Sequence, residues 1–238
     1  MANRLNKKTT RRLRLAFIGV LILLIIPAIQ VLLIRFINPP ATMPMILRSI
    51  HSRFDSSMTH ANKFQWVSIR NVPESFLTCV WQSEDRHFLE HFGFDWEEIQ
   101  NAREEAKATG KLARGASTMT QQCARSLFLW QSRSWLRKGM EAYYTVLLEL
   151  LLPKKRIFEL YINVIELGDG IYGLEAASHH YYGIAAISMT KEESAMLVAI
   201  MPNPKQWDPN KPGERVLRRQ KVILERGGNV ALPERLHN

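Results

Sequence analysis

The feature that most constrains this chain is an uncharged, apolar run near its N-terminus, from Leu15 to Ile34. A helix of about 20 apolar residues is long enough to cross the hydrocarbon core of a membrane, and a proline within it is tolerated. Six basic residues precede the run: Arg4, Lys7, Lys8, Arg11, Arg12 and Arg14. A basic flank keeps the N-terminus in the cytoplasm, so the chain beyond the helix is exported. We therefore predict a cytoplasmic basic N-terminus over 1–14 and an uncleaved transmembrane helix over 15–36.

The length and composition leave room for one exported domain behind this helix. The chain has 238 residues, of which 46% are hydrophobic and 23% are charged, as is typical of globular proteins. Lysine and arginine number 32 against 22 acidic residues, so the formal net charge is +10. Such an excess points to an anionic partner: nucleic acid, a phospholipid surface or a phosphorylated substrate. The sequence has no nucleic-acid-binding signature, so we expect no nucleic-acid partner.

The rest of the chain divides by its local patterns. A proline pair opens a linker or membrane-proximal segment, which we place at 37–64. Helical patterns then dominate, so we predict a mainly α domain over 65–226 and a C-terminal tail over 227–238. Cys79 and Cys123 fall in predicted helices, and we expect them to be buried free thiols.

One carboxylate, Glu84, falls on the apolar face of a helix that we predict between Pro73 and Gly93. Residues at helical spacing make up this face: Leu77, Val80, Trp81, Phe88 and His91. Burying a carboxylate is costly unless it is paired or protonated. Because desolvation raises its pKa toward neutrality, Glu84 can act as a general base or acid. The alternative is a structural ion pair of Glu84 with Arg86 or with a distant lysine.

The same segment offers a zinc-binding alternative. His87 and His91 match the pattern H-x-x-E-H of inverted zinc peptidases, and two histidines four apart on a helix can hold one zinc ion. The pattern is short, and no second acidic motif stands out to supply a third ligand. A single histidine on an apolar face, such as His91, is more often a hydrogen-bonded core residue.

Two further clusters suit a phosphorylated ligand. Thr118 and Gln121 form a capping box, so a helix begins there and its free N–H groups can bind an anion. The alternative is an ordinary capped helix with a polar face. Downstream, Arg137, Lys138 and Glu141 share one helix face, where two cations beside a carboxylate suit a pyrophosphate. The alternative there is a surface ion-pair cluster.

Five ordered blocks together carry a resemblance to a known family. The first, E-D-x-x-F-x-x-H-x-G-x-D, is Glu84, Asp85, Phe88, His91, Gly93 and Asp95. The second, G-x-S-T-x-T-Q-Q, runs from Gly115 to Gln122, and the third, R-K-x-x-E, is Arg137, Lys138 and Glu141. The fourth holds Glu159 to Asn163, then Gly168, Gly173, Ala176, Ala177, Tyr182 and Gly183, and the fifth runs from Glu193 to Pro204. The chain thereby resembles glycosyltransferase family 51, the peptidoglycan glycosyltransferases, and within it the monofunctional, membrane-anchored members.

The resemblance implies a fold and an activity. It implies a mainly α, lysozyme-like helical glycosyltransferase domain with a mobile, membrane-facing lobe. It also implies polymerisation of lipid II on the outer, periplasmic side of the inner (cytoplasmic) membrane, where the 4-hydroxyl of lipid II attacks the anomeric carbon of the donor with inversion. The donor is a growing glycan on undecaprenyl pyrophosphate. Cell-division or wall-synthesis proteins are further expected partners.

The resemblance also implies roles for individual residues. Glu84 would be the catalytic base, and Glu141 would lie beside the departing pyrophosphate. No tightly bound cofactor is expected, although a divalent cation, Mg²⁺ or Mn²⁺, is allowed near Glu141. The implied substrate-binding residues are Asp85, Phe88, His91, Gly115, Ser117, Thr118, Gln121, Gln122, Arg125, Arg137 and Lys138. The chain departs from the family at Arg125-Ser126, where Lys-Asn is usual; arginine keeps the charge there but not its geometry.

Three other functions stay open at this point. A muramidase-type hydrolase also uses two carboxylates, but it has no pyrophosphate to bind with cationic residues. The zinc peptidase based on His87 and His91 is a second alternative. A membrane-tethered scaffold without enzymatic activity is the third. The same fold can support several of these functions, so the site has to decide between them.

Overall fold

The computed structural model describes residues 2–54, 62–110, 115–132, 134–227 and 230–237. Its helices are α1 (Ala2–Phe36), α2 (Met43–His51), α3 (Glu74–Glu84), α4 (Trp96–Thr109), α5 (Met119–Phe128), α6 (Trp135–Leu151), α7 (Lys154–Val164), α8 (Leu174–Tyr182), α9 (Lys191–Ile200), α10 (Glu214–Gly227) and α11 (Glu234–His237). Short 3₁₀ turns span Ile69–Asn71 and Ala186–Ser188. The strands are β1 (Lys63–Phe64), β2 (Glu166–Gly168) and β3 (Ile171–Tyr172). The prediction of a mainly helical protein is confirmed.

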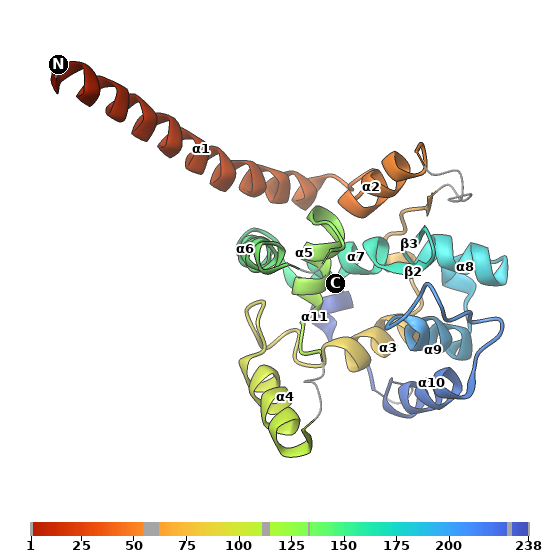
Figure 1. Ribbon diagram of the computed structural model, residues 1–238. Coiled ribbons are helices and arrows are strands. Elements are labelled where there is room, and N and C mark those ends of the chain that lie inside the picture. The colour runs from red at the N-terminus through yellow and green to blue at the C-terminus, as the bar shows by residue number, and fades with distance from the viewer. Residues whose placement is uncertain (1, 55–61, 111–114, 133, 228–229, 238) are drawn as a thin grey trace.

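The N-terminal helix α1 extends as a long arm from the rest of the molecule (Figure 1). Within the described residues, one helical segment, Thr9–Phe36, is long and apolar enough to cross a membrane. It contains the predicted span. The helix continues N-terminally through the basic residues, so most of the predicted basic N-terminus is helical as well.

The last turns of α1 pack onto the domain. Val31 is fully buried, and the Tyr144 hydroxyl donates to the Gln30 side-chain oxygen at 2.6 Å. The guanidinium of Arg156 donates to the carbonyl oxygen of Ile34 at 2.8 Å and to that of Ile37 at 3.2 Å. These carbonyls lie at the helix end, where no further turn satisfies them. The C-terminal end of the predicted anchor is therefore part of the folded domain.

The segment predicted as a linker contains an element that the sequence patterns did not indicate. Helix α2 lies beside the C-terminal end of α1 (Figure 1). Arg48 on α2 makes a two-pronged ion pair with Asp169, at 2.6 and 3.0 Å. Asp169 lies between β2 and β3, which form an antiparallel pair, and β1 adds to β3 in parallel. This small sheet holds the membrane-proximal segment against the domain.

Helix α5 lies at the centre of the helical core. It packs against α6 and α7, while α3, α9 and α10 pack against one another on another side of the domain. Cys123 on α5 is fully buried and Cys79 on α3 is 2% exposed; both are free thiols, as predicted. The C-terminal segment also packs inward, since Leu232 and Leu236 are buried and α11 contacts α7. The segment predicted as a C-terminal tail therefore packs on the domain in its described part.

The prediction of one helix from Pro73 to Gly93 is also wrong. Helix α3 ends at Glu84, and Pro73 precedes its first residue. Asp85 leaves the helical region, with φ −164° and ψ 78°. Its carboxylate accepts from the backbone N–H of Met119 at 2.9 Å and pairs with His91 at 3.0 Å. These contacts draw the chain away from the helix axis into a turn that folds back on the core, where Phe88 is buried and the His91 side chain is 8% exposed.

The Asp85 contacts lead to a stability prediction. Asp85→Asn should lower the free energy of unfolding by about 1.5–3 kcal/mol, because hydrogen bonds to a buried charged acceptor contribute on that order. Denaturant unfolding of the full chain in detergent measures the loss. Glu214→Gln is the control, since that carboxylate is 89% exposed in its pair with Arg218 and should contribute little. Equal stability of the two variants would show that Asp85 does not hold α3 to α5.

Gly173 leads to a second stability prediction. It has φ 79° and ψ 161°, and an added Cβ would lie 2.4 Å from the carbonyl oxygen of Asn163. Gly183 has a similar φ of 71°, but nothing lies within 4 Å of its added Cβ. Gly183→Ala should cost about 1–2 kcal/mol for the left-handed backbone alone. Gly173→Ala should cost clearly more in the same unfolding measurement, and equal costs would contradict the close approach to α7.

Candidate active site

The Glu84 carboxylate lies at the C-terminal end of α3, with 15% of its side chain exposed. Gln122 on α5 donates to Oε2 at 3.3 Å, and Arg219 on α10 donates to Oε1 at 3.2 Å. Desolvation by burial raises the pKa of Glu84 above its ordinary value, while Gln122 and Arg219 oppose this increase. The predicted ion-pair partners, Arg86 or a lysine, are wrong: the partner is an arginine on α10.

A further helix, α7, supports this arrangement through Tyr161. The Tyr161 hydroxyl donates to the side-chain oxygen of Gln122 at 3.1 Å, so the amide nitrogen of Gln122 faces Glu84. Burial raises the pKa of Tyr161 well above its ordinary value, which keeps the hydroxyl protonated as a donor. Each oxygen of Glu84 accepts one bond here and retains a further lone pair. The carboxylate is thus oriented, partly dehydrated and free to accept a proton.

Three predicted site residues that follow Glu84 in the chain, Asp85, Phe88 and His91, contact other protein groups. Asp85 and His91 pair with each other, and Phe88 is fully buried, with its ring against those of His91 and Phe158. The Lys154 ammonium lies 4.5 Å from the centre of the Phe88 ring. All three side chains therefore contact protein groups and shape the site from within. Their predicted contribution to substrate binding remains a prediction.

The zinc hypothesis loses its geometric basis. His87 and His91 lie in a turn rather than on a helix, and each is bonded to a different carboxylate. His87 Nδ1 lies 3.0 Å from Asp95, and His91 Nε2 lies 3.0 Å from Asp85. Among the described residues, no group of three or more histidines, cysteines or acidic residues is arranged to hold a metal ion. His91 is a hydrogen-bonded core residue, as the alternative interpretation held.

The helix start at Thr118 is confirmed, but the N–H groups there are not free. The Thr118 hydroxyl oxygen accepts from Gln121 N–H at 3.3 Å, and the Gln121 side-chain oxygen accepts from Thr118 N–H at 3.0 Å. The Met119 N–H is taken by Asp85. Internal acceptors therefore use the N–H groups of Thr118, Met119 and Gln121, and the anion site expected at this helix start stays a prediction. Within this block Gly115 is exposed, Ser117 and Gln122 are partly exposed, and Thr118 and Gln121 are buried; Arg125, which follows the block, is exposed.

The third predicted cluster forms on α6. Arg137 Nη1 lies 2.6 Å from Glu141 Oε2, and the Lys138 ammonium contacts the other oxygen. Glu141 is 1% exposed, whereas the Lys138 side chain is 42% exposed. Arg137 Nε is buried and has no acceptor within the described part of the chain. Two cations around one carboxylate leave a net positive charge that reaches the surface through Lys138.

This arrangement does not fit a divalent cation at Glu141. Both carboxylate oxygens already contact a cationic side chain, so a metal ion would have to displace Arg137 or Lys138. Oxygen ligands that bind Mg²⁺ or Mn²⁺ are not otherwise grouped there in the described residues. The mechanism proposed for this site therefore contains no step through a metal ion, and a cation requirement of the reaction stays a prediction.

Helix α5 lies between the two clusters. Its N-terminal turn contacts the end of α3 through Met119 and Gln122. Its body packs on α6, where Phe128 stacks on Tyr144 with ring centres 4.2 Å apart. The Thr120 hydroxyl also donates to Glu149 on α6 at 2.6 Å. One helix therefore links the Glu84 carboxylate to the helix that carries Arg137 and Lys138.

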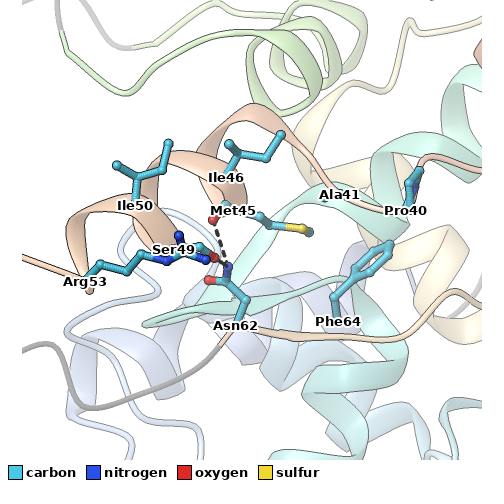
Figure 2. A pocket seen from close by; sticks show the side chains of 9 residues that line it. All are labelled: Pro40, Ala41, Met45, Ile46, Ser49, Ile50, Arg53, Asn62 and Phe64. Carbon is cyan, nitrogen blue, oxygen red and sulfur yellow. Dashed lines mark hydrogen bonds between the residues drawn. The ribbon is translucent and has the colours of Figure 1, made fainter.

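A separate cavity of about 500 Å³ lies between α2 and β1 (Figure 2). Its lining is mostly apolar: Pro40, Ala41, Met45, Ile46, Ser49, Ile50, Arg53, Asn62 and Phe64. In Figure 2, Asn62 points toward α2 and donates to the carbonyl oxygen of Met45 at 2.8 Å. None of the predicted site residues lines this cavity.

Two residues of the Glu84 site had not been assigned a role from the sequence. Tyr161 lies within the fourth block, to which no catalytic or binding role was assigned. Arg219 is one of several basic residues on the last long helix, and it lies 135 positions from Glu84. The sequence signal available for Arg219 was its position beside the apolar face of α10. Its partner could not be identified without the fold.

Comparison with known proteins gives one consistent result. The transglycosylase family model matches residues 51–227. A biosynthetic peptidoglycan transglycosylase of Xanthomonas campestris pv. campestris is 41% identical over 227 residues, which cover 95% of this chain and 92% of that relative. A protein of the same description from Caulobacter vibrioides is 41% identical over 227 residues, covering 95% of both chains. Another, from Haemophilus influenzae, is 41% identical over 199 residues, covering 84% of this chain and 81% of its own.

These matches agree with the resemblance drawn from the five sequence blocks. The matched range includes Glu84, Glu141 and Arg219, together with all of the helices that carry them. The mainly helical architecture is the one expected of this lysozyme-like domain. Similarity extends through the N-terminal helix in relatives that match 95% of the chain. The chain therefore belongs to the transglycosylase family.

Proposed function

We propose that this protein is a peptidoglycan glycosyltransferase that polymerises lipid II into β-1,4-linked glycan strands and releases undecaprenyl pyrophosphate. The observation that carries the proposal is the pairing of an oriented, partly dehydrated carboxylate with a separate cationic cluster. Glu84 suits the removal of a proton, and Arg137 with Lys138 suits a diphosphate leaving group. The names of the relatives support the same activity.

In this mechanism Glu84 is the general base. It takes the proton from the 4-hydroxyl of the acceptor as that oxygen attacks the anomeric carbon of the donor, with inversion. The raised pKa of Glu84 brings its basicity closer to that needed near neutral pH. Gln122 and Arg219 each bind one carboxylate oxygen, which limits rotation of the side chain. A base held in this way has less orientational freedom to lose at the transition state.

The cationic cluster serves the leaving group. As the bond from the anomeric carbon to the pyrophosphate breaks, negative charge develops on the departing phosphate oxygen. Arg137 and Lys138 can stabilise that charge, because Glu141 neutralises only one of the two cations and aligns both. Ser117 and Gln122 of the second block, and Arg125 just after it, are exposed enough to reach the donor phosphates and sugars.

We assign the protein to the inner membrane of the cell, with the domain on the periplasmic side. The basic residues ahead of the apolar helix favour a cytoplasmic N-terminus. An anchor that holds the domain at the bilayer raises the effective concentration of a lipid-linked substrate. Lipid II and the glycan on undecaprenyl pyrophosphate are therefore the proposed partners, together with the bilayer itself.

The hydrolase alternative is less well supported by the site. A glycosidase uses its second carboxylate as a base or nucleophile. Glu141 contacts two cations and is 1% exposed, so it is poorly placed for either role. The cations themselves have no role in hydrolysis of an uncharged glycosidic bond. The peptidase alternative lacks the zinc geometry, because His87 and His91 bind different carboxylates.

Replacement of the base tests the mechanism directly. Glu84→Gln keeps the size of the side chain but removes the proton acceptor, so the polymerisation rate should fall by about 10²-fold or more. The assay is incubation of the purified full chain with labelled lipid II, followed by separation of the polymer. Glu90→Gln is the matched control, because Glu90 is exposed and lies outside the site. Retention of more than about a tenth of the wild-type rate in Glu84→Gln would rule out the assigned base.

The departure from the family at positions 125 and 126 supplies another test. Arg125→Ala should lower donor affinity by roughly tenfold, because a charge-assisted contact is about twice as strong as a neutral one. Ser126→Asn adds at most one neutral hydrogen bond, so affinity should rise by several-fold at most. Steady-state kinetics on lipid II measure both, with thermal melting to check folding. A neutral Arg125→Ala beside an inactive Ser126→Asn would show that this face of α5 does not meet the donor.

A further inference from the structure

We infer that Arg219 is a positioning residue for the catalytic base, holding Glu84 in one orientation and in its ionised form. This inference rests on the proposed function of Glu84. Arg219 Nη2 lies 3.2 Å from Glu84 Oε1, and both side chains are mostly buried, at 34% and 15% exposed. Arg219 therefore acts on the reaction through Glu84 and is not itself the base.

The position of Arg219 is set by the packing of α10. Val216 precedes it by three residues and Ile223 comes four residues after it, and both are buried on the same helix face. Near the C-terminal end of α10, a Cβ added at Gly227 would lie 3.2 Å from the Cα of Cys79 on α3. Gln220 also donates to the carbonyl oxygen of Glu192 on α9 at 2.9 Å. Because α10 contacts both neighbouring helices closely, the guanidinium is held at the end of α3.

The charge of Arg219 is directed to Glu84. Among the described residues, Glu84 is the carboxylate that forms an ion pair with Arg219. The buried Nε of Arg219 has no acceptor there. The adjacent Arg218 differs in exposure and in partner. It is 78% exposed and pairs with Glu214 on the solvent side at 3.4 Å. Neighbouring arginines on one helix thus provide a test residue and a matched control of the same charge.

Other groups also face Glu84. Asp85 lies next in the chain and disfavours ionisation of Glu84 by like-charge repulsion. Arg125 on α5 favours ionisation from a distance, and the neutral Tyr161 hydroxyl on α7 bonds to Gln122. Arg219 on α10 is the cation within hydrogen-bond distance. Since a nearby cation favours the charged form, removing Arg219 should raise the pKa of Glu84 further.

The sign of the expected effect depends on this change in pKa. The base acts in its deprotonated form, so kcat/KM rises with pH as Glu84 loses its proton. A higher pKa moves this acid limb to higher pH. A purely structural role of Arg219 would lower activity or stability without moving the limb. A direct contact with substrate would mainly raise KM.

The experiment measures kcat and KM for polymerisation of labelled lipid II as a function of pH, using the full chain in detergent. We expect Arg219→Gln to move the acid limb up by about one pH unit. We expect its kcat at the pH optimum to fall roughly tenfold through loss of orientation. Arg219→Lys should keep the wild-type limb but lose part of kcat, because the charge remains and the planar fork is lost. Arg218→Gln should match the wild type in both measurements.

Several outcomes would overturn the inference. An unmoved acid limb in Arg219→Gln, or a loss confined to KM, would show that Arg219 does not act through Glu84. If Arg219→Gln melts too low to be assayed, Arg219→Lys decides, and wild-type kcat in that variant would reject the orienting role. The Glu84→Gln variant separates the role of Arg219 from that of the base. Wild-type activity there would overturn the proposed base itself, whereas an inactive Glu84→Gln with a wild-type Arg219→Gln would overturn this inference alone.

Discussion

The arrangement of the site depends on the buried carboxylate of Asp85. This carboxylate accepts from Met119 N–H and pairs with His91. These contacts end α3 and hold the start of α5 next to that end. Its neighbour Glu84 is consequently the last residue of α3, beside the first turn of α5. The two adjacent acidic residues therefore have different roles. The Asp85 carboxylate is bonded to protein groups, whereas each oxygen of Glu84 keeps a lone pair that can accept a proton.

Glu84 and Glu141 are both carboxylates largely removed from water, but their charges are compensated in different ways. Glu141 is almost fully buried and is compensated by two cations on its own helix, one turn away. Glu84 is compensated by one cation from a distant helix and one neutral amide, and desolvation still dominates. A buried carboxylate whose charge is fully compensated stays ionised, whereas one whose charge is only partly compensated takes up a proton more readily. The difference in environment supports the different roles proposed for these two glutamates.

Local patterns predicted some of this structure well and the rest poorly. The capping box at Thr118 and the Arg137–Glu141 cluster depend on residues three and four apart, so the sequence displays them directly. The end of α3 at Glu84 depends on contacts of Asp85 with α5, 34 positions away. The helical pattern through His91 continued past that point and was misleading. The Arg219 partner and helix α2 likewise depend on the fold, and periodicity alone could not identify them.

The way in which α1 ends has a consequence for the geometry of the product. Arg156 binds the terminal carbonyls of α1, and Tyr144 binds Gln30 within its apolar stretch. A domain joined to its anchor by such contacts cannot swivel about a loose tether. In the proposed membrane-anchored arrangement, the tilt of α1 in the bilayer would set the height of Glu84 above the lipid headgroups and the direction in which a lengthening polymer leaves the surface.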